Sequence, residues 1–167
     1  MRKLSILKAI VDYLWVLSMV VFPLIVIFSI VMVFDSDIID IPIKTSGKEF
    51  ILDTIWNKIA FLIITISFGL LLFALYKFRK LLQLFKDKKI FEVETALLFN
   101  EIGKLIIYYS FIDLFVEFLL KLSKNEIIIN LGYGSFLSFL SLGLFFVVLG
   151  EVFKIGQRIK EQNELTI

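Results

Sequence analysis

The stretch that decides the fold runs from Ala9 to Phe34 and reads AIVDYLWVLSMVVFPLIVIFSIVMVF. Asp12 is the only charged residue among its 26 residues, and as an α-helix they would extend about 39 Å. The hydrocarbon core of a bilayer is about 30 Å thick. This stretch therefore predicts a transmembrane helix with length to spare for tilt.

Three more apolar stretches follow, at 59–76, 105–120 and 131–152. The first of them carries no charge, whereas Asp113 and Glu117 interrupt the second. The expected fold class is thus an all-α integral membrane protein, a bundle of four transmembrane helices. An alternative with three spans makes the segment around 105–120 re-entrant.

Composition supports one membrane domain covering residues 1–167. The chain is 59% hydrophobic, above the roughly 45–50% of soluble domains, and its loops leave no room for a separate soluble domain. It has no cysteine and no histidine, which removes thiolate nucleophiles, the commonest general base and most soft-metal ligands. A net charge of +2 indicates no nucleic-acid-binding surface. We expect no enzyme activity, no cofactor, no metal and no direct contact with nucleic acid.

Orientation follows from the positions of lysine and arginine, which are retained on the cytoplasmic side of a membrane. Thirteen of the 18 lie at the N-terminus, in the loop 77–104 or in the tail 153–167, and five lie in the two other loops. With four spans, this distribution predicts a cytoplasmic (inner) membrane protein with both termini in the cytoplasm. A three-span chain would place the basic segments on both faces.

The loops carry their own signals. Residues 38–52 alternate around Ser46 and Gly47, and residues 126–130 are β-branched, so we expect a small extracytoplasmic β element with up to three strands. The loop 77–104 predicts two amphipathic cytoplasmic helices, one continuing the second span and one beginning near Phe91 after a break at 87–89.

Two segments resemble a known family. One is the loop segment 88–96, KKIFEVETA, with Gly103 further on, and the other is the tail 151–167, EVFKIGQRIKEQNELTI. Together they resemble the small four-helix prokaryotic membrane proteins called domain of unknown function 2975. The chain has Lys88 where glycine is common in the family and Glu92 where threonine is expected, so a helix cap is altered here.

The resemblance implies a membrane protein without an assigned activity. Family members are often encoded beside a small helix-turn-helix regulator, which implies a cytoplasmic DNA-binding protein as a partner. The leading interpretation is a membrane accessory or regulatory protein that presents its basic loop and its C-terminal tail to such a partner. The residues assigned to this face are Lys77, Arg79, Lys80, Lys86, Lys88, Lys89, Phe91, Phe153, Gly156, Glu164, Leu165, Thr166 and Ile167.

The loop and the tail leave the membrane on the same side, so we expect them to pack together. The apolar contacts would join Leu81, Leu84 and Phe85 to Phe153 and Ile159. Ion pairs would join Glu161 and Glu164 to Lys86, Lys88 or Lys89.

Carboxylates inside the spans offer a second interpretation. Asp113, Glu117 and Lys121 recur every four residues and so share one helix face, which should point to the protein interior because charge is costly in lipid. They are either a proton or cation site of a small carrier or an internal polar seam in which Lys121 pairs with Glu117. We favour the seam, because a carrier would usually have more polar positions on its other spans.

Two further patterns have simpler interpretations. Asp12 and Glu151 each have a lysine within one helical turn, Lys8 and Lys154, which predicts interfacial ion pairs rather than catalytic acids. In the last span, small residues permit close helix packing within the chain or a homo-oligomer. They are Gly134, Ser138, Ser141, Gly143 and Gly150.

Overall fold

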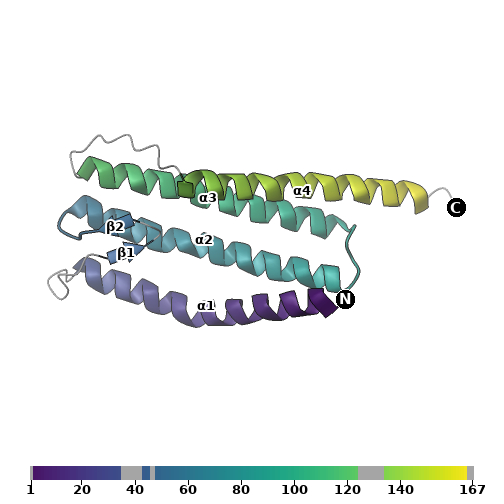
Figure 1. Ribbon diagram of the computed structural model, residues 1–167, viewed down its shortest axis with the longest axis horizontal. Helices are drawn as coiled ribbons and strands as arrows, with labels where there is room; N and C mark the ends of the chain where they lie inside the picture. Colours follow the sequence, from purple (N-terminus) through teal and green to yellow (C-terminus); the bar gives the residue numbers. More distant parts are fainter. Residues whose placement is uncertain (1, 35–42, 46–47, 124–133, 165–167) are drawn as a thin grey trace.

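Four long α-helices dominate the described part of the chain (Figure 1). In this computed structural model the described residues are 2–34, 43–45, 48–123 and 134–164. The helices are α1 (Arg2–Phe34), α2 (Ile55–Lys86), α3 (Val93–Ser123) and α4 (Gly134–Glu164). Each has 31 to 33 residues, so each is at least about 46 Å long and exceeds the thickness of a bilayer core.

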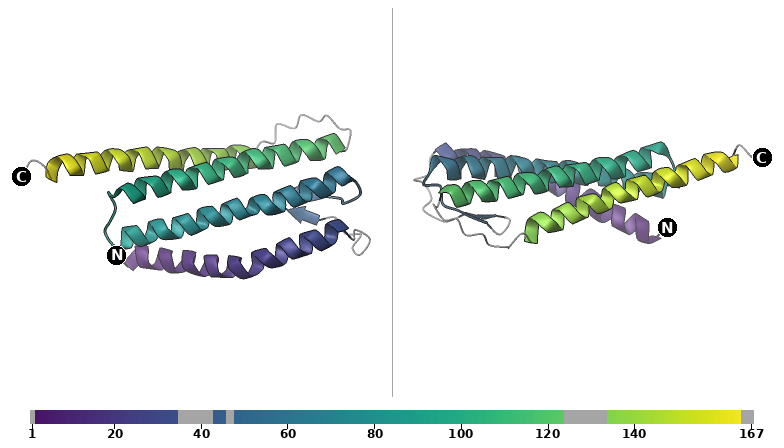
Figure 2. Two further views of the ribbon diagram at one scale, coloured as in Figure 1. Left: turned by 180° about the vertical axis from the view of Figure 1, so that it is seen from behind. Right: turned by 90° about the horizontal axis from the view of Figure 1, so that it is seen from above.

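The helices lie side by side in chain order, and each runs antiparallel to the one before it (Figures 1 and 2). Extensive packing joins α1 to α2, α2 to α3 and α3 to α4, but not the described parts of α1 and α4. The expected bundle is therefore an open row with α1 and α4 at its edges. The two chain ends and the connection between α2 and α3 lie at the same end of the row, which we call the basic end (Figure 1).

Three helices are long and apolar enough to cross a membrane: α1, α2 and residues Ser135–Asn163 of α4. By length and composition, α3 does not qualify among the described helices. The charged residues of α3 account for this, since Asp113, Glu117 and Lys121 fall within nine residues of its second half and Glu101 and Lys104 lie in its first half. Its membrane crossing stays a prediction.

The break between α2 and α3 is confirmed, and the structure shows how it is made. α2 ends at Lys86, Lys88 has a positive φ of 61°, and the Lys89 N–H donates to the Leu84 carbonyl at 2.9 Å. The Lys88 N–H donates to the Phe85 carbonyl, which completes the Schellman pattern of a helix C-terminus. Thr95 then fixes the start of α3, because its hydroxyl donates to the Lys89 carbonyl at 2.9 Å.

A short hairpin lies between α1 and α2. Its strands β1 (Ile43–Thr45) and β2 (Lys48–Phe50) are antiparallel, with Ile43 opposite Phe50 and Thr45 opposite Lys48. The predicted third strand at 126–130 lies outside the described residues. The placement of the hairpin on the outer side of a membrane stays a prediction.

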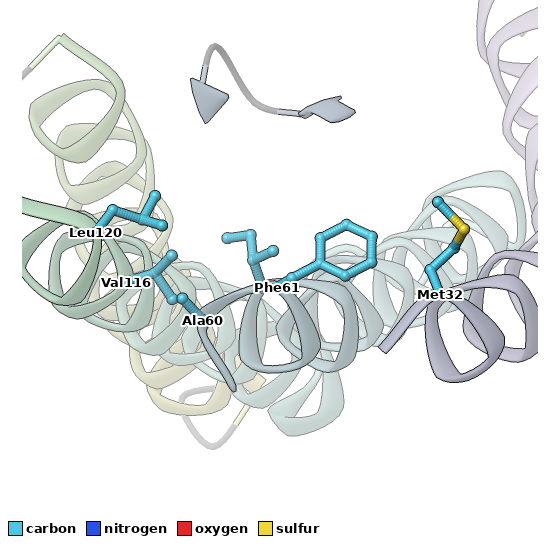
Figure 3. Close-up of a cluster of buried hydrophobic side chains, with 6 residues drawn as sticks. Met32, Ala60, Phe61, Val116 and Leu120 are labelled. Carbon is cyan, nitrogen blue, oxygen red and sulfur yellow. The ribbon is translucent and has the colours of Figure 1, made fainter. Parts of the chain in front are cut away.

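The buried core consists of two clusters at different heights along the row. The cluster far from the basic end joins three helices: Phe61 points toward Met32 of α1, and Ala60 lies beside Val116 of α3 (Figure 3). The other cluster joins α2 and α3 near the basic end through Ala74, Leu81, Leu98, Phe99, Ile102 and Ile106, with phenylalanines of α4 packed against it. Because α2 and α3 contribute to both clusters, they form the centre of the row.

Side chains tie α1 to α2 at two heights. The hydroxyls of Ser29 and Thr65 lie 3.2 Å apart in a buried position, so that one donates to the other while the second donates to a carbonyl oxygen of its own helix. Near the basic end, the Asp12 carboxylate accepts hydrogen bonds from Lys8, at 2.8 Å, and from Nε of Arg79 on α2. The predicted pair of Asp12 and Lys8 is thus confirmed, and Arg79 extends it to a second helix.

Candidate functional site

Aromatic rings bind the tail to the loop at the basic end. The ring of Phe153 on α4 lies 4.8 Å from Phe99, 5.8 Å from Phe85 and 5.9 Å from Phe91, measured between centroids. The prediction that Phe85 meets Phe153 is confirmed. Ile159, which was expected to join this contact, is instead exposed, because it lies on the face of α4 that points away from Phe153 and α3.

Gly156 receives the ring of Phe91. A Cβ atom built on Gly156 would lie 2.7 Å from Cε1 of Phe91, which is closer than such atoms approach in folded proteins. Because Gly156 has no side chain, the Phe91 ring in the connection between α2 and α3 can pack directly on the backbone of α4. This contact joins the two segments that carry the family resemblance, since Phe91 belongs to the loop segment and Gly156 to the tail.

The basic residues of α2 and of the turn that follows it differ in the partners that they contact. Lys77 pairs with Glu101 of α3 at 2.8 Å, Arg79 pairs with Asp12, and Lys80 lies 5.1 Å from the centroid of the Tyr76 ring. Three further lysines, Lys86, Lys88 and Lys89, are exposed and form no ion pair within the described part of the chain. The turn between α2 and α3 thus exposes three lysines without ion pairs among the described residues, while Asp87, Glu92 and Glu94 bring the net charge of residues 86–94 to zero.

The predicted ion pairs between the tail and these lysines are wrong for Glu161. Its carboxylate accepts a hydrogen bond from Nε2 of Gln157, one turn earlier on α4, at 2.6 Å. Glu161 lines a groove with Phe91, Glu92 and Glu94, and the lining of that groove does not include these lysines. Glu164 is the last residue of α4 and its side chain is not described, while Leu165, Thr166 and Ile167 lie outside the described residues.

Two adjoining grooves lie between α3 and α4 at the basic end. One, of about 310 Å³, has apolar walls from Val93, Ala96 and Leu97 on α3 and a charged rim that includes Lys154 and Arg158 on α4. The second, of about 420 Å³, lies beside it and is lined by Phe91, Glu92, Val93, Glu94, Gln157, Lys160 and Glu161. The basic end therefore offers apolar and charged contacts next to each other.

Of the polar residues predicted on one face of α3, Asp113 contacts α4, whereas Glu117 and Lys121 pair within α3. Asp113 is 1% exposed and accepts a hydrogen bond from Oγ of Ser135 at 3.0 Å. Lys121 pairs with Glu117 at 2.8 Å, as the polar-seam interpretation predicts, and both side chains are half-buried. A groove of about 510 Å³ between α2 and α3 at this depth is lined by apolar side chains and Ser67, whose hydroxyl donates to its own helix.

Glycines bring α3 and α4 into backbone contact. A Cβ atom on Gly103 would lie 2.6 Å from the Gly143 carbonyl oxygen, and one on Gly150 would lie 3.1 Å from the Ala96 carbonyl oxygen. Of the two interpretations of the small residues, packing within the chain accounts for Gly143 and Gly150. Ser138 and Ser141 are exposed on another face, and Gly134 is the first residue of α4.

A family model described as protein of unknown function (DUF2975) matches residues 8–167, nearly the whole chain. The chain belongs to this family. Comparison with curated proteins and with solved structures found no match. The resemblance on the loop and tail segments is thereby confirmed, and these segments are the ones that meet at Phe91, Phe153 and Gly156.

Sequence reasoning missed the contacts that hold the basic end together. Arg79 reaches Asp12 across 67 positions in the chain, and Lys77 reaches Glu101 on the next helix. A signal was present, since Asp12 and Glu101 are acidic residues among predominantly basic segments of the same predicted face. Ser135 as the donor to Asp113 had no such signal, because apolar spans contain many serines that bond only to their own helix.

Proposed function

We propose that this chain is a membrane-embedded accessory protein whose working surface is the basic end. The observation that carries the proposal is the aromatic contact of Phe153 with Phe85, Phe91 and Phe99, which holds the loop and the tail in one surface. Three unpaired lysines and two amphipathic grooves lie on that surface. A soluble partner would meet fixed side chains there rather than loose loops.

The proposed placement has all four helices crossing a cytoplasmic membrane with both termini inside. α3 is included because it packs along its length between α2 and α4, so a membrane that holds those two helices surrounds α3 as well. Its carboxylates are compatible with this position, since Asp113 is buried against α4 and Glu117 is paired with Lys121. The hairpin would then lie on the outer side.

The proposed partner is a small helix-turn-helix regulator, as the family resemblance implies. Such a partner suits the surface if it brings an acidic patch to Lys86, Lys88 and Lys89 and an apolar side chain to the groove beside Leu97. Docking would hold the regulator at the membrane. The chain itself is proposed to contact neither the nucleic acid nor a cofactor, and to catalyse no reaction.

The experiment measures binding of the regulator encoded beside the gene to the chain in lipid nanodiscs. We expect micromolar affinity for the wild type and at least a tenfold loss in the variant in which Lys86, Lys88 and Lys89 are replaced by glutamine. The matched control replaces Lys44, Lys48 and Lys58, at the other end of the row, by glutamine and should bind like the wild type. Equal binding by both variants, or none by the wild type, would reject this partner.

The carrier remains the second candidate because Asp113 is buried within the row. It is disfavoured because its carboxylate already accepts a hydrogen bond from Ser135 and the neighbouring groove is almost entirely apolar. Proton-coupled flux into liposomes would decide: we expect none in the wild type. A flux that Asp113→Asn abolishes would replace the docking proposal by the carrier.

A further inference from the structure

α4 has an apolar stripe on the face opposite α3. The stripe consists of Phe145, Val148, Val152, Ile155 and Ile159, each between 54% and 59% exposed. We call these five residues the outer stripe. Gly143 and Gly150 face α3, and Phe153 packs on α2 and α3, so the outer stripe has no neighbour within the described part of the row.

Successive residues of the outer stripe are three, four, three and four positions apart. This alternation is the a/d spacing of a helix that packs along a second helix, with an average of 3.5 residues per contact. This period is also that of any single helix face, and Leu142 and Leu144 in the apolar half of α4 are exposed as well. Beyond Val152 the other positions include Lys154, Arg158 and Lys160, so there the apolar stripe indicates an amphipathic helix with a packing partner.

The outer stripe continues beyond the level where the membrane should end. Phe146 lies 6.2 Å from Phe78, which stands between the basic residues Lys77 and Arg79 of α2. Ile155 and Ile159 follow Phe146 by nine and 13 residues, about 14 and 20 Å along the helix. α4 runs past the ends of α2 and α3 without turning aside (Figures 1 and 2). With the membrane placement proposed above, lipid therefore does not cover this half of the stripe.

We propose that the outer stripe is the interface of a parallel homodimer, with α4 of one copy packed along α4 of a second copy. A second copy in the same bilayer has the same orientation and depth, so each residue of the stripe meets its own equivalent across a two-fold axis. The stripe is thereby matched both inside and outside the membrane. The proposal rests on the membrane placement proposed above but not on the regulator.

Charge along the stripe permits this pairing. Two charged residues, Glu151 and Arg158, border one edge of the stripe, and Gly156 borders the other. In a parallel pair each edge faces the opposite edge of the second helix, so Glu151 lies across from Gly156 of the second copy, and Arg158 lies across from Asn163. Two like charges are therefore not forced together.

The length of the stripe also helps to decide between a second copy of the chain and a soluble protein as its partner. Val152, Ile155 and Ile159 alone cover little more than one heptad, well short of the roughly 1,200 Å² that a stable soluble interface buries. Phe145 and Val148 extend the same seam into the membrane, where both copies are already aligned. A soluble protein could cover only the outer half, which favours a second copy as the occupant.

The test uses single cysteines, which are specific because the chain has none of its own. Cysteine replaces each residue from 152 to 161 in turn in the full chain, and native membranes are treated with a short bis-maleimide. We expect dimer bands strongest at 152, 155 and 159, at least fivefold above those at 154, 157 and 161, on the side of α4 that borders the α3 groove. Uniform bands, or a maximum at 154, 157 and 161, would overturn the dimer.

Two controls separate the possible failures. A membrane-impermeant maleimide should label the Ile159→Cys variant only from the cytoplasmic side; labelling from the outside would reject the membrane placement instead. A cross-linked band of another mass at 155 and 159, without the dimer band, would show that a different protein covers the stripe and would overturn the dimer.

Disruption gives an independent readout. Ile155→Glu should convert the dimer to monomer in single-molecule photobleaching of liposomes, while the charge-matched control Lys160→Gln, off the stripe, should remain dimeric. Dimers that persist in Ile155→Glu would overturn the proposal.

Discussion

The two edge helices of the row are held in different ways, although each packs against one main neighbour. α4 meets α3 through the backbones of Gly103 and Gly143, whereas α1 meets α2 through side chains such as Ser29 and Thr65. Side chains can change rotamer, but two backbones in contact cannot adjust without moving the helices. We therefore expect α3 and α4 to behave as one rigid unit and α1 to be the more easily displaced edge.

The largest effect should come from Gly103→Ala. The added Cβ would lie 2.6 Å from the Gly143 carbonyl oxygen and 2.9 Å from the Val147 backbone nitrogen, so the two helices must separate. Overpacking of this kind costs about 3 kcal/mol. Reversible unfolding in detergent micelles, followed by circular dichroism, should show this loss of stability.

The matched control is Gly69→Ala on α2. Its Cβ would lie 3.3 Å from Cζ of Phe22, the far end of a side chain on α1 that can turn away. We expect a change below about 1 kcal/mol, and a helix-favouring gain from alanine could offset it. Equal losses in the two variants would contradict the difference between the two edges.

A smaller effect is expected from Asp12→Asn, which weakens the contacts of α1 with Lys8 and Arg79. Polar contacts of membrane helices contribute on average about 0.6 kcal/mol each, so a loss of about 1 kcal/mol should follow. Cross-linking between α1 and α2 measures how far this contact loosens. Cysteines replacing Trp15 and Tyr76, whose rings lie 5.2 Å apart, should cross-link less in the Asp12→Asn variant.

The same variant should leave the other edge unchanged. Cysteines replacing Phe99 and Phe153, whose rings lie 4.8 Å apart on α3 and α4, provide that reference. Lys80→Gln serves as the control substitution, because Lys80 is next to Arg79 but is not among the described partners of Asp12, which are Lys8 and Arg79. A drop at both cysteine pairs would mean that the row loosens as a whole.

Much of the fold was predictable because apolar length and charge breaks are local signals. The helix boundaries near 34 and 86 follow from them, as do the ion pairs of Asp12 with Lys8 and of Glu117 with Lys121, whose members are one turn apart. The order of helices in space was not predictable. An apolar helix face can pack on lipid or protein at similar cost, so composition does not say whether four long helices form a closed bundle or a row.

The contacts of the site were predictable only where neighbouring residues in the sequence form a recognisable local pattern. Phe153 and Gly156 stand out as a Phe-x-x-Gly step, and both make the expected contact between tail and loop. The pairing of Glu161 with a lysine failed because it depends on where α4 ends relative to α2, a distance set by tertiary packing. Arg79 was assigned to a partner surface, yet it is bound to Asp12 within the chain.

The smallest effect concerns the turn that connects the α1–α2 half to the α3–α4 half. Lys88 occupies the left-handed position of the helix C-terminus, with φ of 61°, where the family resemblance leads us to expect glycine. A side chain with a Cβ is strained there, whereas glycine is not, although glycine also adds entropy to the unfolded chain. Lys88→Gly should therefore stabilise the fold by about 0.5 kcal/mol.

The control that isolates the effect of backbone strain replaces Lys88 by alanine. Lys88→Ala also removes the charged side chain but keeps the Cβ, so it should be no more stable than the wild type in the same unfolding measurement. Lys89→Gly, whose backbone is outside the positive-φ region, should be destabilising. If Lys88→Gly and Lys88→Ala were equally stable, the lysine charge rather than the backbone conformation would set the energy of this turn, and the two halves would be joined by an unstrained connection.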